Sequence, residues 1–337
     1  MIGRLLIAAA GFALLGSVAM PRAHAQAADW SKIVVAAKAE GKVVIYGSPV
    51  PATMARISAD FEKANPGIVV EYHRMIGASF FNKMEQDRKG QVDGADATVT
   101  PEVAWLEDAA KDGALRPLAA PSAKGWPSSH MLGGMAPVLA VAPYVLAYNV
   151  NIVKSPVTGY RDLLRPEFKG RVGVPDPTAE AQVAFYDWLE KTQGADFLLQ
   201  LAAQSPRIYS GSIPMTQSAA AGEIAVTSST VLDLVNPLIA QGAPLKTVVP
   251  AASIGFAYAG AVVGWAKRPN AAQVYLDYLM SPRGQVIWHG RGESASPLPN
   301  VAGSLDVKTI ALYDRKLYPV EVLTAYRQKW NKLFRPQ

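Results

Sequence analysis

The 337-residue sequence contains no cysteine. Disulfides, thiolate metal sites and a cysteine-linked lipid anchor are therefore excluded. Two catalytic motifs are also missing, the Gly-x-Ser-x-Gly nucleophile elbow and the His-Glu-x-x-His zinc helix. Beyond residue 25 the histidines are His73, His130 and His289, which lie far apart in sequence and show no metal-ligand spacing. We therefore expect no enzyme, and a site with no catalytic residue, no metal and no cofactor.

Long apolar runs and charge clusters are equally scarce. Beyond the first 25 residues no run is long enough to predict a transmembrane helix. Lysine and arginine are scattered along the chain, which argues against nucleic acid as a partner. The formal net charge is +6, and it falls to +4 without Arg4 and Arg22. This mild positive charge favours anionic ligands.

The first 25 residues have the composition of a cleavable secretory signal peptide. Arg4 gives a positive start, residues 5–20 carry no charge, and Ala23-His24-Ala25 places small residues where a signal peptidase cleaves. An uncleaved membrane anchor is the alternative, but a span needs about 20 apolar residues and this run ends at Pro21-Arg22. We expect a protein of the bacterial periplasm, outside the reach of ATP and NAD pools.

The remaining chain reads as an α/β fold with more than one core. Cleavage after residue 25 of 337 would leave 312 residues, more than a single core usually serves. Short β-rich runs at 43–47, 68–72 and 95–99 are each followed by a helical pattern. Three such units in a row predict a parallel sheet with helices on its faces.

Two long extended runs divide the chain. Residues 138–149 form the first, which Pro143 interrupts, and residues 254–266 form the second. We expect the first to cross from one lobe to another and the second to return. One large doubly wound sheet is the alternative. The expected division is 26–137 plus 255–337 for the first lobe and 138–254 for the second.

Several segments in order carry a resemblance to a known family. They are GKVVIYGS (41–48), FEKANPGIVVEY (61–72), ADATVTPE (95–102), YVLAYNVNIV (144–153), YRDLLRPEFKGRVGVPDPT (160–178), EIAVTSST (223–230) and AQVYLDYLMSPRGQ (272–285). With them the chain resembles the family-1 extracellular solute-binding proteins, which are periplasmic components of ABC transporters. That group includes binders of iron(III), aminoethylphosphonate, thiamine and polyamines.

The resemblance implies a type II-like periplasmic binding protein, in which two α/β lobes close on a ligand in the cleft between them. It implies an inner-membrane ABC permease and its ATPase as partners, and we expect a monomer. A periplasmic sensor subunit that docks a receptor would share the fold and the ligand site, so it remains an alternative function.

Candidate ligand contacts follow from strand ends, because ligands bind beyond the carboxyl ends of strands in α/β sheets. Such loops contain Tyr46, Ser48, Ala78, Ser79, Thr100, Asp176 and Thr178. The loops at Ala78 and Asp176 also open helices, whose free N–H groups and dipole favour an anion. The alternatives are that Ser79 and Thr178 only cap their helices and that Asp176 only caps a turn. Asp176 could also accept a ligand amine.

Five further candidates lie outside these loops. Arg74 could bind an anion through two hydrogen bonds or be a solvated surface residue. Tyr144 and Tyr258, on the two extended runs, could contact ligand or form hinge core. Ser228 and Ser229 could bind an oxyanion or cap a helix. Glu102, in the loop after the third strand, is a weaker candidate than these five, because an acidic residue early in a helix is ordinary dipole compensation.

The resemblance also bears on whether the ligand is iron(III). Iron-binding members resemble one another in a tandem tyrosine pair after the strand that corresponds to Glu223–Thr227, and this chain has Ser228-Ser229-Thr230 there. Hard Fe(III) prefers anionic oxygen ligands. We therefore predict a small organic anion as the ligand, namely a phosphonate, a phosphate ester or a carboxylate. Iron(III) transport is the alternative.

Overall fold

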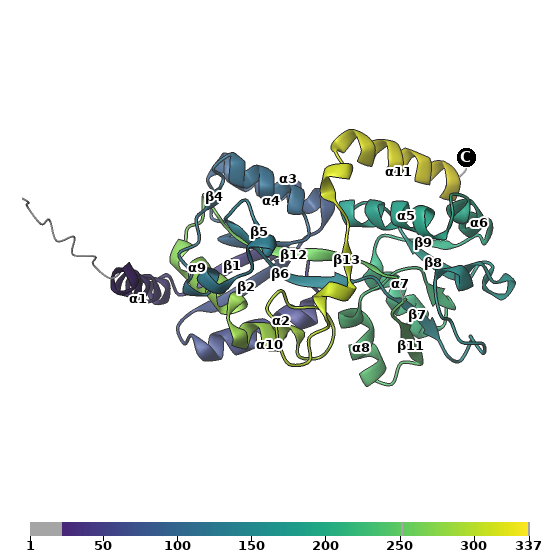
Figure 1. Ribbon diagram of the computed structural model, residues 1–337, viewed down its shortest axis with the longest axis horizontal. Coiled ribbons are helices and arrows are strands. Elements are labelled where there is room, and N and C mark those ends of the chain that lie inside the picture. The colour runs from purple at the N-terminus through teal and green to yellow at the C-terminus, as the bar shows by residue number, and fades with distance from the viewer. Residues whose placement is uncertain (1–21, 251, 336–337) are drawn as a thin grey trace, which may run out of the picture.

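The computed structural model describes residues 22–250 and 252–335, which fold into two α/β lobes side by side (Figure 1). Each lobe has its own β-sheet with helices on both faces. The predicted two-lobed α/β architecture is confirmed, and the alternative of one doubly wound sheet is wrong. The predicted signal peptide falls on residues 1–25, of which residues 1–21 lie outside the described residues.

The larger sheet belongs to the first lobe. Its strands are β1 (Lys42–Gly47), β2 (Val69–Arg74), β3 (Ala97–Thr100), β4 (Leu115–Arg116), β5 (Met131–Leu132), β6 (Ala136–Pro143), β12 (Ile254–Val263) and β13 (Ala311–Leu312). Their order is β2-β1-β3-β12-β6-β5, with β4 and β13 also paired to β12. β1 runs parallel to β2 and β3, as the three βα units predict, whereas β12 is antiparallel to β3 and β6.

The smaller sheet belongs to the second lobe. Its strands are β7 (Leu146–Asn149), β8 (Val172–Pro175), β9 (Arg207–Tyr209), β10 (Val226–Thr227) and β11 (Leu245–Val248). Their order is β11-β7-β10-β8-β9. β8 runs parallel to β9 and β10, so the carboxyl ends of these three strands meet at one edge of the sheet.

Helices cover both sheets on both faces (Figure 1). They are α1 (Arg22–Glu40), α2 (Pro51–Ala64), α3 (Gly77–Gly90), α4 (Val103–Lys111), α5 (Glu180–Gln193), α6 (Phe197–Ala203), α7 (Ser212–Ala221), α8 (Leu232–Ala240), α9 (Pro269–Met280), α10 (Pro282–His289) and α11 (Val320–Phe334). In the first lobe α3 and α4 lie opposite α2, α9 and α10. In the second lobe α5 and α6 lie opposite α7 and α8.

The first βα unit shows how the sequence produces these elements. The residues of β1 after Lys42 are all buried, because the strand lies inside a sheet that is covered on both faces. In α2 the buried residues Met54, Ile57 and Phe61 recur at helical spacing and form the face toward the core. Pro51 begins the helix, where its missing N–H costs nothing.

The two lobes meet where two chain segments hydrogen-bond to each other. β6 and β7 belong to different sheets, so the chain changes lobe between Pro143 and Leu146, within the extended run that predicted a crossing. The return is different, because β12 lies in the first sheet from Ile254 onward. The Tyr144 N–H donates to the Ile254 carbonyl at 3.0 Å, and the Ser253 hydroxyl donates to the Tyr144 carbonyl at 2.9 Å.

The C-terminal helix corrects the predicted lobe boundaries. Residues 255–337 were all expected in the first lobe, but α11 packs on α5 and α6 of the second lobe. The segment before it runs from the first lobe to the second (Figure 1). Arg315 forms an ion pair with Glu107 of α4, and the Tyr318 hydroxyl donates to the Asp187 carboxylate of α5 at 2.5 Å. The lobes therefore have a third connection that the extended runs did not predict.

The first helix also begins earlier than predicted. We expected a helix over 29–40 capped by Asp29, whereas α1 begins at Arg22 and includes Asp29 in its interior. The predicted cleavage after Ala25 would therefore remove the first turn of α1. Among the described residues, no helix is both long and apolar enough to cross a membrane.

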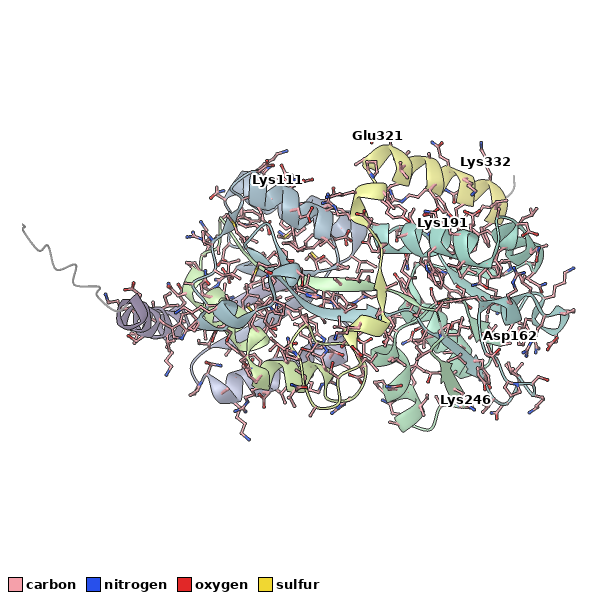
Figure 2. All side chains as sticks on the ribbon, in the orientation of Figure 1. Lys111, Asp162, Lys191, Lys246, Glu321 and Lys332 are labelled. Atoms are coloured by element: carbon pink, nitrogen blue, oxygen red, sulfur yellow. The ribbon has the colours of Figure 1, made fainter. Side chains whose placement is uncertain are left out.

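A buried ion pair joins distant parts of the first lobe. Arg268, which precedes α9, donates through Nε to the Asp96 carboxylate at 2.7 Å, and its backbone N–H donates to the same carboxylate at 2.9 Å. The Asp96 side chain is fully buried and also accepts from the Val44 N–H at 2.9 Å. Most other charged side chains are solvated, as the labelled Lys111, Lys191 and Glu321 show (Figure 2).

Candidate functional site

A cavity of about 190 Å³ lies between the two lobes. The first lobe contributes Ser48 from the loop after β1 and Arg74 from the end of β2, and the second lobe contributes Thr178 and Gln182 around the start of α5. Tyr144 lines the cavity from the crossing segment. A molecule bound there would contact both lobes and the hinge between them.

Six helices begin at the wall of this cavity. The residue at the N-cap of each helix is among the lining residues: Val50 for α2, Ile76 for α3, Glu102 for α4, Ala179 for α5, Gly211 for α7 and Val231 for α8. Each helix N-terminus presents up to four N–H groups without intrahelical partners and a partial positive charge. Convergence of several such ends makes the cavity wall electropositive.

The N-cap residues leave the ends of these helices unsatisfied. Serine, threonine, aspartate and asparagine are the side chains that usually cap helices, and none of them occupies these six positions. No N-cap side chain among the six accepts a hydrogen bond from its own helix. At the start of α3 one N–H group does have a partner, because the Gly77 N–H donates to the Glu102 carboxylate of the next helix. At α4, α5 and α8 one early N–H already bonds a backbone carbonyl, namely Val103 to Pro101, Gln182 to Ala179 and Leu234 to Val231. The Ala179 N–H has no partner within the described residues.

Arg74 is the only basic residue among the described residues that line the cavity. Its Nε donates to the Ser48 carbonyl at 3.2 Å, which holds the guanidinium at the wall. Within residues 22–250 and 252–335, no carboxylate forms an ion pair with it. The two terminal nitrogens therefore remain free to bind an anion through two parallel hydrogen bonds.

Ser48 presents a second unsatisfied group. The residue is 6% exposed, and its hydroxyl oxygen is buried with no hydrogen-bond partner in the described part of the chain. A buried hydroxyl without a partner costs free energy. A ligand atom at this position would remove that cost.

Aromatic rings form the hinge side of the cavity. Tyr144 and Phe256 have ring centroids 5.1 Å apart, and Phe256 and Tyr258 have centroids 5.2 Å apart. Phe256 and Tyr258 alternate along β12 and so share one face of the strand. Burial raises the pKa of both tyrosines, so the hydroxyls stay neutral and can donate. Neither hydroxyl bonds to another described residue, which leaves both for a ligand.

Two buried carboxyl groups from different lobes lie close enough for the charge of one to act on the other. Glu102 lines the cavity from the first lobe, and Glu180 begins α5 in the second. Burial and then the charge of Glu180 raise the pKa of Glu102 to about 7. Burial also raises the pKa of Glu180. Both carboxyls are therefore far more easily protonated than ordinary glutamates.

Asp233 on α8 is a third buried carboxyl between the lobes. It accepts a hydrogen bond from the Thr53 hydroxyl of α2 at 3.4 Å. Burial and then the charge of Glu293 raise its pKa to about 7. This contact joins the start of a first-lobe helix to the start of a second-lobe helix.

Five of the twelve predicted site residues line the cavity: Ser48, Arg74, Tyr144, Thr178 and Tyr258. Seven lie elsewhere: Tyr46, Ala78, Ser79, Thr100, Asp176, Ser228 and Ser229. The strand ends from which the candidates were predicted border this cavity in both lobes. It did not tell which side chains at that edge point into the cleft.

Four of the residues outside the cavity belong to the first lobe. Tyr46 packs edge-on against His73, with ring centroids 5.5 Å apart. The Ser79 hydroxyl donates to the Ile76 carbonyl at 2.8 Å, within the first turn of α3. Thr100 is buried, and its hydroxyl accepts from the Glu102 N–H at 3.3 Å. Ala78 is exposed on α3. Local hydrogen bonds and packing thus account for three of them.

The other three belong to the second lobe. The Asp176 carboxylate forms an ion pair with Arg335 of the C-terminal segment at 2.5 Å, so it is not free to accept a ligand amine. Ser228 and Ser229 are fully buried, and their hydroxyls have no partner among the described residues. Neither serine caps α8, because that helix begins at Leu232 after Val231.

Several lining residues were not among the predicted site residues. Ser210 and Ser212 flank Gly211 at the start of α7, a helix that was not predicted. They follow β9, so the strand-end rule would have found them had it been applied there. Phe256 lies two residues before Tyr258, and the period of two in a strand was the available signal. Glu102 was rated below the others, although it is the only carboxyl in the described cavity wall.

No group of three or more histidine, cysteine, aspartate or glutamate side chains in the described part of the chain could hold a metal ion. The cavity wall instead offers one guanidinium, unsatisfied amide and hydroxyl donors, and aromatic rings. That donor set suits an anion rather than a cation.

The family of bacterial extracellular solute-binding proteins matches residues 42–292 of this chain. No curated protein matches the sequence significantly.

Several solved structures are similar. The substrate-binding protein of an ABC transporter from Agrobacterium tumefaciens is 19% identical with a TM-score of 0.78, covering 87% of this chain and 94% of its own. AfuA from Actinobacillus pleuropneumoniae, a periplasmic binding protein solved with fructose-6-phosphate, is 20% identical with a TM-score of 0.71 over 88% and 99%. Iron-bound HitA from Pseudomonas aeruginosa is 20% identical with a TM-score of 0.62 over 87% and 98%. These similarities establish the fold.

Proposed function

The chain belongs to the family of bacterial extracellular solute-binding proteins, the solute-binding components of ABC transporters, and we propose that it captures a small organic anion between its two lobes. The anion would be a phosphonate, a phosphate ester or a carboxylate. Loaded protein would deliver it to an inner-membrane permease with its ATPase. We further propose that the protein acts in the periplasm as a monomer, after cleavage of the signal peptide.

The observation that carries this proposal is the unpaired guanidinium of Arg74 in a wall built from helix N-termini. Arg74 is exposed to solvent, and its guanidinium can bind an anion through two charge-assisted hydrogen bonds. The α5 and α7 ends add amide donors from the second lobe. An anion placed there would bind the Arg74 guanidinium of the first lobe and the amide donors of the second lobe at the same time.

The aromatic wall supports an organic ligand rather than a bare inorganic ion. Tyr144, Phe256 and Tyr258 offer apolar surface and two neutral hydroxyls. Small-molecule sites commonly combine apolar walls with a few polar groups that set orientation. A ligand with an anionic head and a carbon skeleton would use both parts of this cavity. The sugar phosphate bound in AfuA belongs to that class.

Iron(III) is less well supported by this chain. Ser228 and Ser229 occupy the positions where a tyrosine pair was sought, and neither lines the cavity. The two tyrosines of the cavity have raised pKa values, which oppose phenolate formation. We therefore do not extend the iron binding of HitA to this chain on the basis of these residues.

A thermal-shift screen of ligand-stripped, refolded protein tests the proposal. Matched probes would be benzoate with benzyl alcohol, glycerol 3-phosphate with glycerol, and phenylphosphonate, together with spermidine and Fe(III)-citrate. A probe at 100 times its Kd stabilises by about 2.7 kcal/mol, and each kcal/mol raises Tm by roughly 2–4 °C at this size. We expect stabilisation by at least one anion and none by its neutral partner. Stabilisation by spermidine or iron alone would contradict the proposal.

A further inference from the structure

The C-terminal helix holds the loop that leads into α5. Arg327, on α11, donates from Nε to the Pro177 carbonyl at 2.9 Å and from Nη2 to the Thr178 carbonyl at 2.9 Å. Next to them, Asp176 is paired with Arg335. Asp176, Pro177 and Thr178, which precede the N-cap of α5, are thus all bonded to α11 or to Arg335, which directly follows it.

These two hydrogen bonds set the direction of the next amide. In a planar trans peptide the carbonyl and the following N–H point in opposite directions. Because the Thr178 carbonyl points toward Arg327, the Ala179 N–H points away from it. Ala179 lines the cavity, and its N–H makes no hydrogen bond within the described part of the chain. Arg327 therefore aims a free donor of the α5 end without lining the cavity itself.

The charge of Arg327 is unusual for its place. A cation near a helix N-terminus is unfavourable, because the helix dipole is positive there. The two carbonyl bonds offset that cost. The field of this guanidinium reaches the cleft, where it acts against the burial that raises the pKa of Glu102 and of Glu180. An anion at the α5 end would feel a second positive charge behind the amides.

We propose that Arg327 is a positioning residue for anion binding, which orients the Thr178–Ala179 peptide toward the cleft and adds positive charge behind it. This inference rests on the proposed anion site. It gives α11 a role in ligand affinity, although no residue of that helix is among the lining residues of the cavity.

Lys329 on the same helix provides a matched control. It forms an ion pair with Glu190 of α5 at 2.7 Å, so it also ties α11 to α5, but it does not touch the 176–178 loop. The variants Arg327→Met and Lys329→Met each remove one charge and one tie between α11 and the second lobe. Arg327→Lys keeps the charge while it loses the two-carbonyl geometry.

The test is calorimetric titration of wild type and the three variants with phenylphosphonate and with glycerol 3-phosphate. Hydrogen exchange of a peptide that covers residues 179–186 is followed with and without each probe. We expect Arg327→Met to weaken binding about tenfold, which corresponds to about 1.4 kcal/mol, with Arg327→Lys intermediate and Lys329→Met within twofold of wild type. Probe-induced protection of the peptide should be reduced in Arg327→Met and kept in Lys329→Met.

Each outcome decides one question. If both probes bind wild type and Arg327→Met equally well, the positioning role is wrong while the anion site stands. If Lys329→Met loses as much affinity as Arg327→Met, general docking of α11 explains the effect and the positioning role is again wrong. If neither probe binds wild type, the proposed anion site fails for these probes and the inference falls with it. Should Arg327→Met not fold, Arg327→Lys carries the same comparison.

Discussion

Glu102 of the first lobe lines the cavity, and the charge of Glu180, buried at the start of α5 in the second lobe, raises the pKa of Glu102. If the lobes moved apart, the charge of Glu180 would act less strongly on Glu102, because the two carboxyls belong to different lobes. The arrangement with the lobes together therefore favours their protonated forms. Ligand binding that holds the lobes together is consequently linked to proton uptake.

Affinity for benzoate should fall as pH rises from 5.5 to 8. The pKa of Glu102 is raised from about 4.5 to about 7 by burial and by Glu180. The raised group stabilises the closed cleft below its ordinary pKa, and this contribution is lost as pH rises through 7. Benzoate stays ionised over the range, so its own titration does not interfere. A loss of at most roughly a hundredfold follows from a shift of this size, measured by calorimetry.

The variant Glu102→Gln separates the contribution of Glu102 to this pH dependence from that of other titrating groups. The variant should bind benzoate with a weaker pH dependence and more tightly than wild type at pH 8. Asp233, whose pKa is also raised to about 7, should supply part of the remaining dependence. Adding Asp233→Asn should therefore flatten the profile further. A wild-type affinity that increases with pH would show that these carboxyls do not control closure.

Arg74→Gln should weaken anion binding without unfolding the protein. The guanidinium makes one hydrogen bond to the Ser48 carbonyl and no ion pair with a described carboxylate, so little structure depends on it. A lost charged hydrogen bond is worth about 1.5–3 kcal/mol, or roughly 10- to 100-fold in Kd. Arg74→Lys should recover part of the affinity, because it restores charge but not two parallel bonds. An unchanged Kd in Arg74→Gln would remove Arg74 from the site.

The parts of the fold that were predicted are those with local signals. Residues 138–149 are extended and apolar with Pro143 inside, and the structure changes sheet at that point. The course of α11 was not predictable in the same way. Its docking on α5 depends on Tyr326 and Lys329 meeting Glu190, which lies more than 130 residues earlier in the chain.

The site shows the same division between local and distant information. Loops after strands were located from sequence, but the side chain that each loop turns toward the cleft depends on the neighbouring strand and helix. Tyr46 and Ser48 illustrate this, because only Ser48 lines the cavity although both flank Gly47. Residues two apart in a strand share a face, so alternation alone would place these two side chains together. They differ because β1 ends at Gly47 and Ser48 lies in the loop beyond it.

Asp96→Ala should destabilise the first lobe more than a surface ion-pair variant. The buried carboxylate binds Arg268 and the N–H groups of Val44 and Lys267. Removal of one partner of a buried pair costs about 3–5 kcal/mol. Lys42→Met, which breaks the half-exposed pair with Glu71, should cost about 1 kcal/mol or less. Denaturant midpoints followed by tryptophan fluorescence provide the comparison, and equal losses would contradict the assigned role of Asp96.

Fe(III) should not bind at the cleft through tyrosinate. Tyr144 and Tyr258 would need to lose protons from hydroxyls whose pKa burial has raised, and no cluster of acidic and histidine side chains in the described chain could replace them. We therefore expect Fe(III)-citrate to produce no visible phenolate-to-iron absorption band and no rise in Tm beyond that given by citrate alone. The control is Ga(III)-citrate, which carries the same charge without the optical band. A visible band that disappears in Tyr258→Phe would show that the metal deprotonates a cavity tyrosine, and it would replace the organic-anion proposal with iron transport.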